Sequence, residues 1–145
     1  MQAGEWGFAN FRKVKGDTDV EKPIINSIYF TKKDEHNPLL TFPVKSGKSV
    51  IDIHVQVINF TLGKHVLTVS ITDQNGNIKL QPSQQTLDAS SLKTVGSYGI
   101  VDATLFVVFD SSELNGVSRL KFDISFDDAV EATAYLYISR EANND

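Results

Sequence analysis

Residues 49–57 read SVIDIHVQV, and polar and apolar side chains alternate along them. Ile51, Ile53, Val55 and Val57 share one face, and the residues between them are polar. This period of two predicts a β-strand with one buried face. After residue 57 the alternation changes phase, which indicates a bulge or a bend between two sheets.

The same alternation recurs along most of the chain, and no long segment has the period of a helix. Asn75-Gly76 is typical of a hairpin turn, and Pro43 places its strand at a sheet edge. About eight strands predict an antiparallel β-sandwich, most simply of immunoglobulin-like topology, with a jelly roll as the alternative. The expected strands cover residues 24–31, 39–44, 50–60, 64–73, 78–80, 100–109, 119–126 and 132–140.

Several details of this sandwich follow from local pattern. Residues 50–60 and 64–73 either form a hairpin or lie in opposite sheets, and residues 81–99 are expected to form a long polar connection. Residues 100–109 become apolar on both faces, which predicts a central strand covered on two sides. Residues 111–116, SSELNG, fit one helical turn with a serine cap and an Asn-Gly stop.

Length and composition restrict the class of protein. The chain has 145 residues, which fits one domain. We expect an N-terminal arm at 1–22, a β-sandwich at 23–140 and a mobile tail at 141–145. The net charge of −4 argues against a nucleic-acid partner. With no cysteine, the chain has no disulfide and no thiol nucleophile.

The sequence leaves the cellular location undetermined. It contains no apolar run long enough to span a membrane. Its start, MQAGEWGF, lacks the basic and apolar regions of a signal peptide. The stretch GKHVLTVSITDQNGN, residues 63–77, resembles strand–turn units of many bacterial immunoglobulin-like modules. That resemblance covers β-hairpin features, identifies no family and assigns no functional residue.

Metal and catalytic motifs are weak. If residues 50–60 and 64–73 form a hairpin, His54 and His65 lie about 17 Å apart, too far to share an ion, and opposite sheets would place them no better. DQNGN has the start of a calcium loop, but Ile78 stands where such a loop needs glycine. No nucleophile elbow or phosphate-binding glycine loop occurs. We therefore expect no catalytic residue, no metal and no cofactor.

Acidic residues gather in the last hairpin loop, at Asp127, Asp128 and Glu131. Paired carboxylates can serve a glycosidase or hold calcium. Carboxylates on a loop without rigid partners are usually solvated, and we favour that interpretation.

The last hairpin also carries a candidate recognition patch. If it turns about residue 129, Lys121 pairs with Tyr137 and Asp123 with Tyr135 on the outward face, and Arg119 lies nearby. Tyrosine and arginine are frequent anchors at interfaces. The same cross-strand pairs also stabilise an exposed sheet without any partner.

The N-terminal arm is rich in aromatic residues. Trp6 and Phe8 would share one face of an extended strand, Phe11 falls out of phase, and basic residues follow at 12–15. Such side chains lose free energy if they stay in water, so we expect them to dock. The candidate surfaces are their own domain, a neighbouring copy, a membrane or a ligand.

These observations predict a non-catalytic module that acts through protein–protein contacts, as a homo-oligomer or as a component of a larger bacterial or phage assembly. A membrane is not favoured as a partner, and no nucleic acid is expected. The alternative is a sandwich that binds a carbohydrate or another small ligand, with Tyr98, Tyr135 or Tyr137 as stacking platforms. The candidate partner-binding residues are Trp6, Phe8, Phe11, Arg119, Lys121, Tyr135 and Tyr137.

Overall fold

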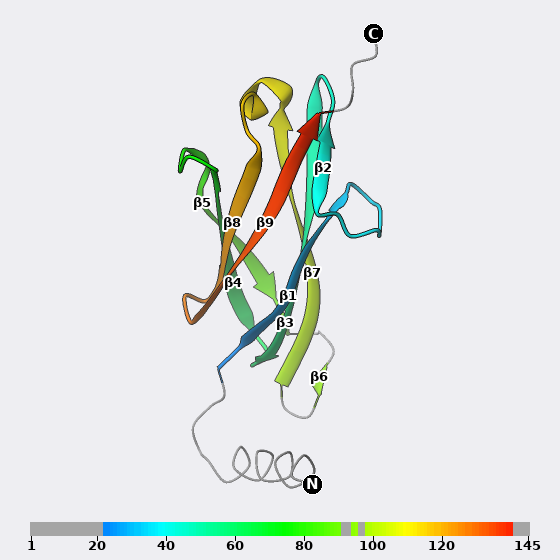
Figure 1. Cartoon of the computed structure of the whole chain (residues 1–145). Coiled ribbons are helices and arrows are strands. Elements are labelled where there is room, and N and C mark those ends of the chain that lie inside the picture. The colour runs from blue at the N-terminus through cyan, green and yellow to red at the C-terminus, as the bar shows by residue number, and fades with distance from the viewer. Residues whose placement is uncertain (1–21, 91–93, 96–97, 141–145) are drawn as a thin grey trace, which may run out of the picture.

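The computed structural model describes residues 22–90, 94–95 and 98–140, which form two packed β-sheets (Figure 1). Within those ranges a single 3-10 turn accompanies the strands. The elements are β1 Ile24–Lys32, β2 Thr41–Val44, β3 Lys48–Phe60, β4 Lys64–Asp73, β5 Ile78–Asp88, β6 Thr94–Val95, β7 Tyr98–Asp110, η1 Ser111–Leu114, β8 Arg119–Phe126 and β9 Val130–Arg140.

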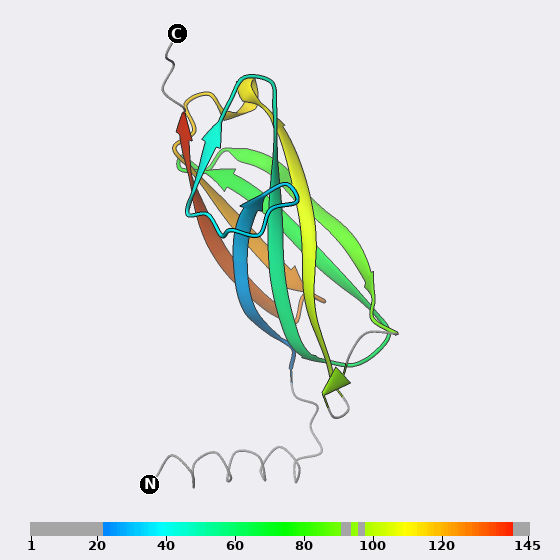
Figure 2. The ribbon, with the colours of Figure 1, turned by 90° about the vertical axis from the view of Figure 1, so that its right-hand side faces the viewer.

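The fold is the predicted immunoglobulin-like β-sandwich. Sheet A has the strand order β1-β3-β7-β6, and sheet B has the order β2-β9-β8-β4-β5. All neighbouring strands are antiparallel except β2 and β9, which run parallel. Figure 2 shows the two layers, with β3 and β7 of sheet A in front of β4 and β5 of sheet B.

The stretch SVIDIHVQV lies in β3 and supplies the centre of the core. Its alternate residues Ile51, Ile53, Val55 and Val57 are at most 1% exposed. They pack against inward residues of sheet B such as Phe122. Burying one such aliphatic side chain contributes about 2 kcal/mol, so this strand alone accounts for much of the core.

A bulge near the end of β3 explains the change of phase. Asn59 has φ +63°, and the register with β7 shifts between Ile58 and Phe60. The extra residue turns the ring of Phe60 into the core, where it is 1% exposed. The predicted bulge is confirmed.

Of the two arrangements open to residues 50–60 and 64–73, the structure has the second, because β3 and β4 belong to different sheets. The link Thr61-Leu62-Gly63 carries the chain from one layer to the other, with Gly63 at φ +124°. β4 instead pairs with β5 and β8.

The polar connection expected at 81–99 is also wrong over much of its length. Residues 78–88 form β5, which pairs with β4 through the predicted Asn75-Gly76 turn. Its side chains are mostly exposed because it is an edge strand. Such a strand needs few apolar residues, which is why its composition resembles that of a loop.

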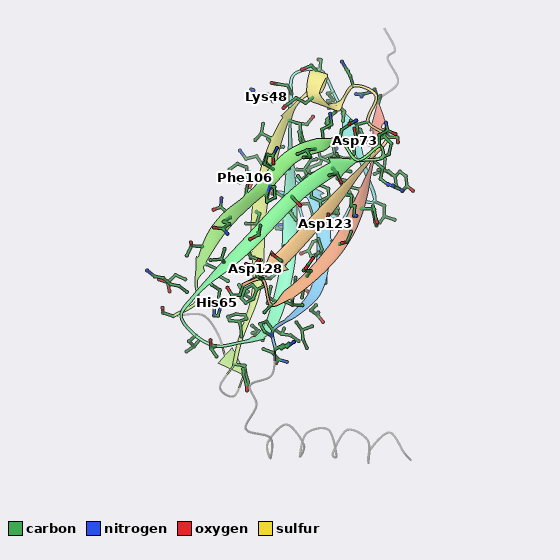
Figure 3. The ribbon with its side chains drawn as sticks, turned by 90° about the vertical axis from the view of Figure 1, so that its left-hand side faces the viewer. Lys48, His65, Asp73, Phe106, Asp123 and Asp128 are labelled. Atoms are coloured by element: carbon green, nitrogen blue, oxygen red, sulfur yellow. The ribbon has the colours of Figure 1, made fainter. Side chains whose placement is uncertain are left out.

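The strand at 100–109 is not covered on two sides. It lies in β7, whose inward residues Val107 and Phe109 are buried, whereas Phe106 is 72% and Val108 42% exposed. Apolar residues on both faces therefore mark an uncovered outer face here. Figure 3 shows Phe106 on that open side of the molecule.

Three smaller expectations concern the edge strand with Pro43, the helical turn at 111–114 and the last hairpin. Pro43 lies in β2 at an edge of sheet B, as predicted. The turn at 111–114 is a short 3-10 helix preceded by Asp110, not by a serine cap. The last hairpin centres on Asp128, not on Ala129, so its pairs differ by two positions from the expected register. The two faces of the hairpin are unchanged because side chains alternate with a period of two.

No helix in the part of the chain that the structure describes is long and apolar enough to cross a membrane.

Candidate interaction surfaces

The predicted tyrosine patch exists on the outer face of sheet B. Tyr135 is 48% and Tyr137 55% exposed. In the observed register Lys121 faces Tyr135, and Arg119 faces Tyr137. The patch therefore joins the four residues expected from the sequence, although with exchanged partners.

Arg119 packs against the ring of Tyr135 within the patch. Its guanidinium carbon lies 5.0 Å from the centroid of the Tyr135 ring, which is close enough for a cation–π interaction. Its Nε atom is buried without a hydrogen-bond partner among the described residues. The arginine side chain is thus held by packing, with its charged guanidinium next to the Tyr135 ring.

The backbone of Leu40 borders this patch, and this neighbour was missed from the sequence. The backbone N–H of Tyr137 donates to the carbonyl of Leu40 at 3.0 Å, and the Leu40 side chain is 82% exposed. We call Leu40, Arg119, Lys121, Tyr135 and Tyr137 the tyrosine face. No local sequence signal could have placed residue 40 beside β9, because that contact depends on the parallel β2–β9 pairing.

The acidic cluster of the last loop is split by the structure. Asp127 turns toward His65, whereas Asp128, Glu131 and Asp123 line a shallow cavity of about 260 Å³ on the outer face of sheet B (Figure 3). The outer face therefore has a basic, aromatic end and an acidic end. Within the described ranges, no three His, Asp or Glu side chains are arranged to hold a metal ion.

His65 is buried and contacts two acceptors. It is 8% exposed, its Nδ1 lies 2.5 Å from Asp127 Oδ2, and its Nε2 lies 2.6 Å from the Thr61 carbonyl. The Thr61 carbonyl and an ionised Asp127 are both acceptors, so this geometry favours an imidazole that donates from both ring nitrogens. Asp127 Oδ1 also accepts from the Val66 N–H at 2.8 Å.

Opposing effects act on the pKa of His65. Burial, the largest of them, lowers the pKa, but the hydrogen bonds to Asp127 and Thr61 and the charge of Asp127 together raise it above its ordinary value. This arrangement ties the β8–β9 loop to the start of β4. The residue is a structural connection and not one of a metal pair.

His54 lies far from that connection, on the outer face of sheet A. Its ring stacks on Tyr29 with centroids 4.5 Å apart, and its nitrogens contact the hydroxyls of Thr31 and Thr104 at 2.8 and 3.2 Å. These contacts satisfy His54 within its own sheet.

In the turn that resembles a calcium loop, the carboxylate of Asp73 accepts hydrogen bonds from the turn itself. Asp73 accepts the backbone N–H groups of Asn75 and Asn77 at 2.8 and 2.9 Å and the Asn77 side chain at 3.0 Å. Burial raises the pKa of Asp73, but these hydrogen bonds outweigh it and lower the pKa below its ordinary value. The carboxylate organises the hairpin turn.

The remaining predicted residues lie elsewhere. Tyr98 begins β7 in sheet A, so it does not join Tyr135 and Tyr137 in sheet B. Trp6, Phe8 and Phe11 lie outside the described residues.

Comparison with known proteins supports the fold. No protein-family model matches the chain, and no curated protein matches its sequence. Part of a bacterial adhesin from Mobiluncus mulieris is similar in two crystal forms, with TM-scores of 0.57 and 0.52 and identities of 12% and 14%. The match covers 82% and 86% of this chain and 58% and 51% of the adhesin.

A Bacteroides fragilis protein assigned as a β-galactosidase is similar as well, with a TM-score of 0.55 and 15% identity. Here 81% of this chain matches 18% of the other. The chain thus spans less than two thirds of each of these proteins. At such identities the likeness shows a shared β-sandwich and nothing finer.

Proposed function

We propose that this domain is a non-catalytic module that acts through protein–protein contacts, as a homo-oligomer or as a component of a larger bacterial or phage assembly. The observation that carries the proposal is the tyrosine face. Two half-exposed tyrosines, a packed arginine and a largely exposed leucine have the composition of an interface centre. The likeness to part of an adhesin agrees with an interaction module but carries no argument about a partner.

The charge distribution of sheet B favours a second copy as partner. Arg119 and Lys121 lie at one end of the outer face, and Asp123, Asp128 and Glu131 lie toward the other. A twofold axis between two copies would place each basic end on the acidic end of its partner. Such self-complementarity is what an isologous dimer requires.

The test is the oligomeric state of the full chain, measured by light scattering behind a sizing column over a range of concentrations. We expect association that weakens with salt and is abolished by Tyr135→Ser with Tyr137→Ser. The matched control is Thr104→Ser, an exposed position on sheet A. Association that persists in the double tyrosine variant would overturn the use of this face.

A carbohydrate or small-ligand site is the second candidate, because the same exposed tyrosines could stack on a sugar ring. The acidic cavity beside them would supply hydrogen-bond acceptors. Saturable binding on a glycan panel that disappears in Tyr137→Ser would favour this candidate. Absence of binding to any glycan, together with tyrosine-dependent association, would favour the protein interface.

A further inference from the structure

The free edge of sheet A is long and unprotected. β7 pairs with β3 up to Asp110, but on its other side the described β6 reaches only Tyr98 and Gly99. From Ile100 to Asp110 the backbone of β7 has no further strand among the described residues. An edge of this kind is a template for one more strand.

A groove runs beside this edge. It has a volume of about 490 Å³ and lies between Leu80, Ser83 and Gln85 of β5 and residues 104–108 of β7. A smaller cavity continues from it to the core residues Ile53 and Val69. The sandwich is therefore open on this side, and Phe106, 72% exposed, stands at the opening (Figure 3).

The composition of this edge favours the addition of a strand with complementary side chains. Residues 98–110 contain no lysine, arginine or proline, which are the residues that usually discourage strand addition. They do contain Asp102 and Asp110, both exposed. The complementary strand would carry aromatic side chains in alternation, followed by basic residues.

Residues 6–12 of this chain, WGFANFR, have that composition. We propose that this segment adds to the free edge of β7 as an antiparallel strand of sheet A. In the best register Trp6 lies opposite Val108, Phe8 opposite Phe106, and Arg12 opposite Asp102. This register covers the exposed apolar residues of β7 and adds a basic partner to Asp102, whose carboxylate already accepts a hydrogen bond from Gln56 Nε2 at 3.2 Å.

The same register suits the inner side of the added strand. Gly7 and Ala9, which are small, would face the narrow groove between the sheets. Phe11 would lie opposite Ala103, a small residue of β7. Moving the strand by two positions in either direction places Arg12 away from Asp102 and leaves an aromatic residue of one strand opposite a polar residue of the other.

The segment can reach the edge within one molecule. Ile24 pairs with Ile58 and Ile58 with Ile100, so β1 begins level with the start of the free edge. The added strand would lie three strand spacings from β1, about 14 Å. Residues 13–23 span up to roughly 36 Å when extended. Such a short connection gives a millimolar effective concentration, which favours the chain's own segment over that of a second copy.

A hollow lies on the path that this connection must take. It has a volume of about 370 Å³, sits on the outer face of sheet A and is lined mainly by Asn26, Gln56, Ile58, Ile100 and Asp102. The connection from residue 12 to residue 24 crosses this surface and covers its isoleucines. The hollow and the open edge are thus explained by one segment.

Trp6 is the only tryptophan of the chain, so its fluorescence reports on the arm alone. We expect a monomeric full chain to emit at the short wavelength of a buried indole. Phe106→Asp should shift the emission toward that of tryptophan in water, and Ile78→Ser, an exposed apolar control in β5 of the other sheet, should not. Water-like emission in the unmodified chain would overturn the proposal, as would burial that is insensitive to Phe106→Asp.

A second test uses the absence of cysteine. With Phe8→Cys and Phe106→Cys together, oxidation should give an intramolecular disulfide, whereas Phe8→Cys with Ile78→Cys should not. A disulfide that joins two molecules, or emission that becomes buried only where a dimer forms, would overturn the proposal in favour of a second copy. Failure here leaves the tyrosine face unaffected, because that surface belongs to sheet B.

Discussion

β5 and β7 are the edge strands on the same side of the sandwich, yet only β5 has features that discourage the addition of a further strand. β5 contains Pro82, which has no N–H to offer, beside a shift in its register with β4 between Val69 and Ile71. β7 has neither device and exposes Phe106. Proline and irregular register discourage the approach of a further strand.

This difference teaches how to interpret apolar residues on an outer face. A polar strand such as β5 can form a stable edge of a sheet in contact with water. β7 instead exposes a row of apolar side chains, and an exposed apolar patch usually marks an interaction site. The two edges also differ in how they are held. β5 follows the Asp73 turn and pairs with β4, which His65 ties to the last hairpin.

The largest effect is expected from His65→Ala, which breaks this anchor on the β5 side. It removes the partner of Asp127, whose side chain is 33% exposed, and the ring that stacks on Phe126. Losing a partly buried charged pair should lower the free energy of unfolding by about 3 kcal/mol. Urea denaturation measures it, with His36→Ala, an exposed histidine, as the control. Equal stability of the two variants would contradict the anchor.

Gly99→Ala tests the short covered part of the β7 edge. A methyl group at this position would overlap the ring of Phe60, which is itself buried in the core. Overpacking of this kind should cost about 2 kcal/mol. Thermal unfolding measures it, and Ala103→Gly supplies a β7 comparison without overlap. An unchanged melting temperature for Gly99→Ala would show that Phe60 moves aside freely.

The free energy of unfolding should decrease at both high and low pH. The two groups responsible are His65 at the start of β4 and Asp73 at the turn between β4 and β5. The folded pKa of His65 is raised from 6.5, so its contribution is complete below that pH and is lost as pH rises through the folded value. The folded pKa of Asp73 is lowered from 3.8, so its contribution is present above that pH and is lost as pH falls through the folded value.

Urea midpoints measured across the pH range should therefore fall at both ends. His65→Gln should flatten the alkaline limb, and Asp73→Asn should flatten part of the acidic limb. An alkaline limb that is unchanged in His65→Gln would assign it to another group.

The smallest effect on stability, within about 0.5 kcal/mol, is expected from Pro82→Val. This substitution restores an N–H to the exposed β5 edge and makes it resemble β7. We expect little change in melting but a new tendency to self-associate, measured by sedimentation velocity. Thr86→Val, which keeps the proline, is the control. If both variants associate equally, hydrophobicity and not the missing N–H protects this edge.

The fold was largely predictable because alternation is strict in β4 and β8 and marks the buried residues Ile51 to Val57 of β3, so each strand has one buried face. The outward position of Tyr135 and Tyr137 was predictable for the same reason. Their partners were not, because Asp127 and Asp128 both adopt positive φ and move the centre of the hairpin by one residue.

Edges were the least predictable feature. Alternation shows which side of a strand is buried but not whether a neighbouring strand lies beside it. β5 was therefore interpreted as a connection and β7 as a central strand. The contacts of Leu40 and of His65 with Asp127 depend on which strands become neighbours across long sequence separations, and no local pattern contains that information.

The positions of β1 and β9 also have a mechanical consequence. β1 begins at one pole of the sandwich, and β9 ends at the other (Figure 1). Tension applied between Ile24 and Arg140 would act along the strands, so the hydrogen bonds of the β1–β3 and β8–β9 ladders would bear the force together in shear. The parallel pairing of β2 with Tyr137–Arg140 would add resistance at the end of β9. A domain pulled in this direction resists extension far better than one whose ladders open bond by bond.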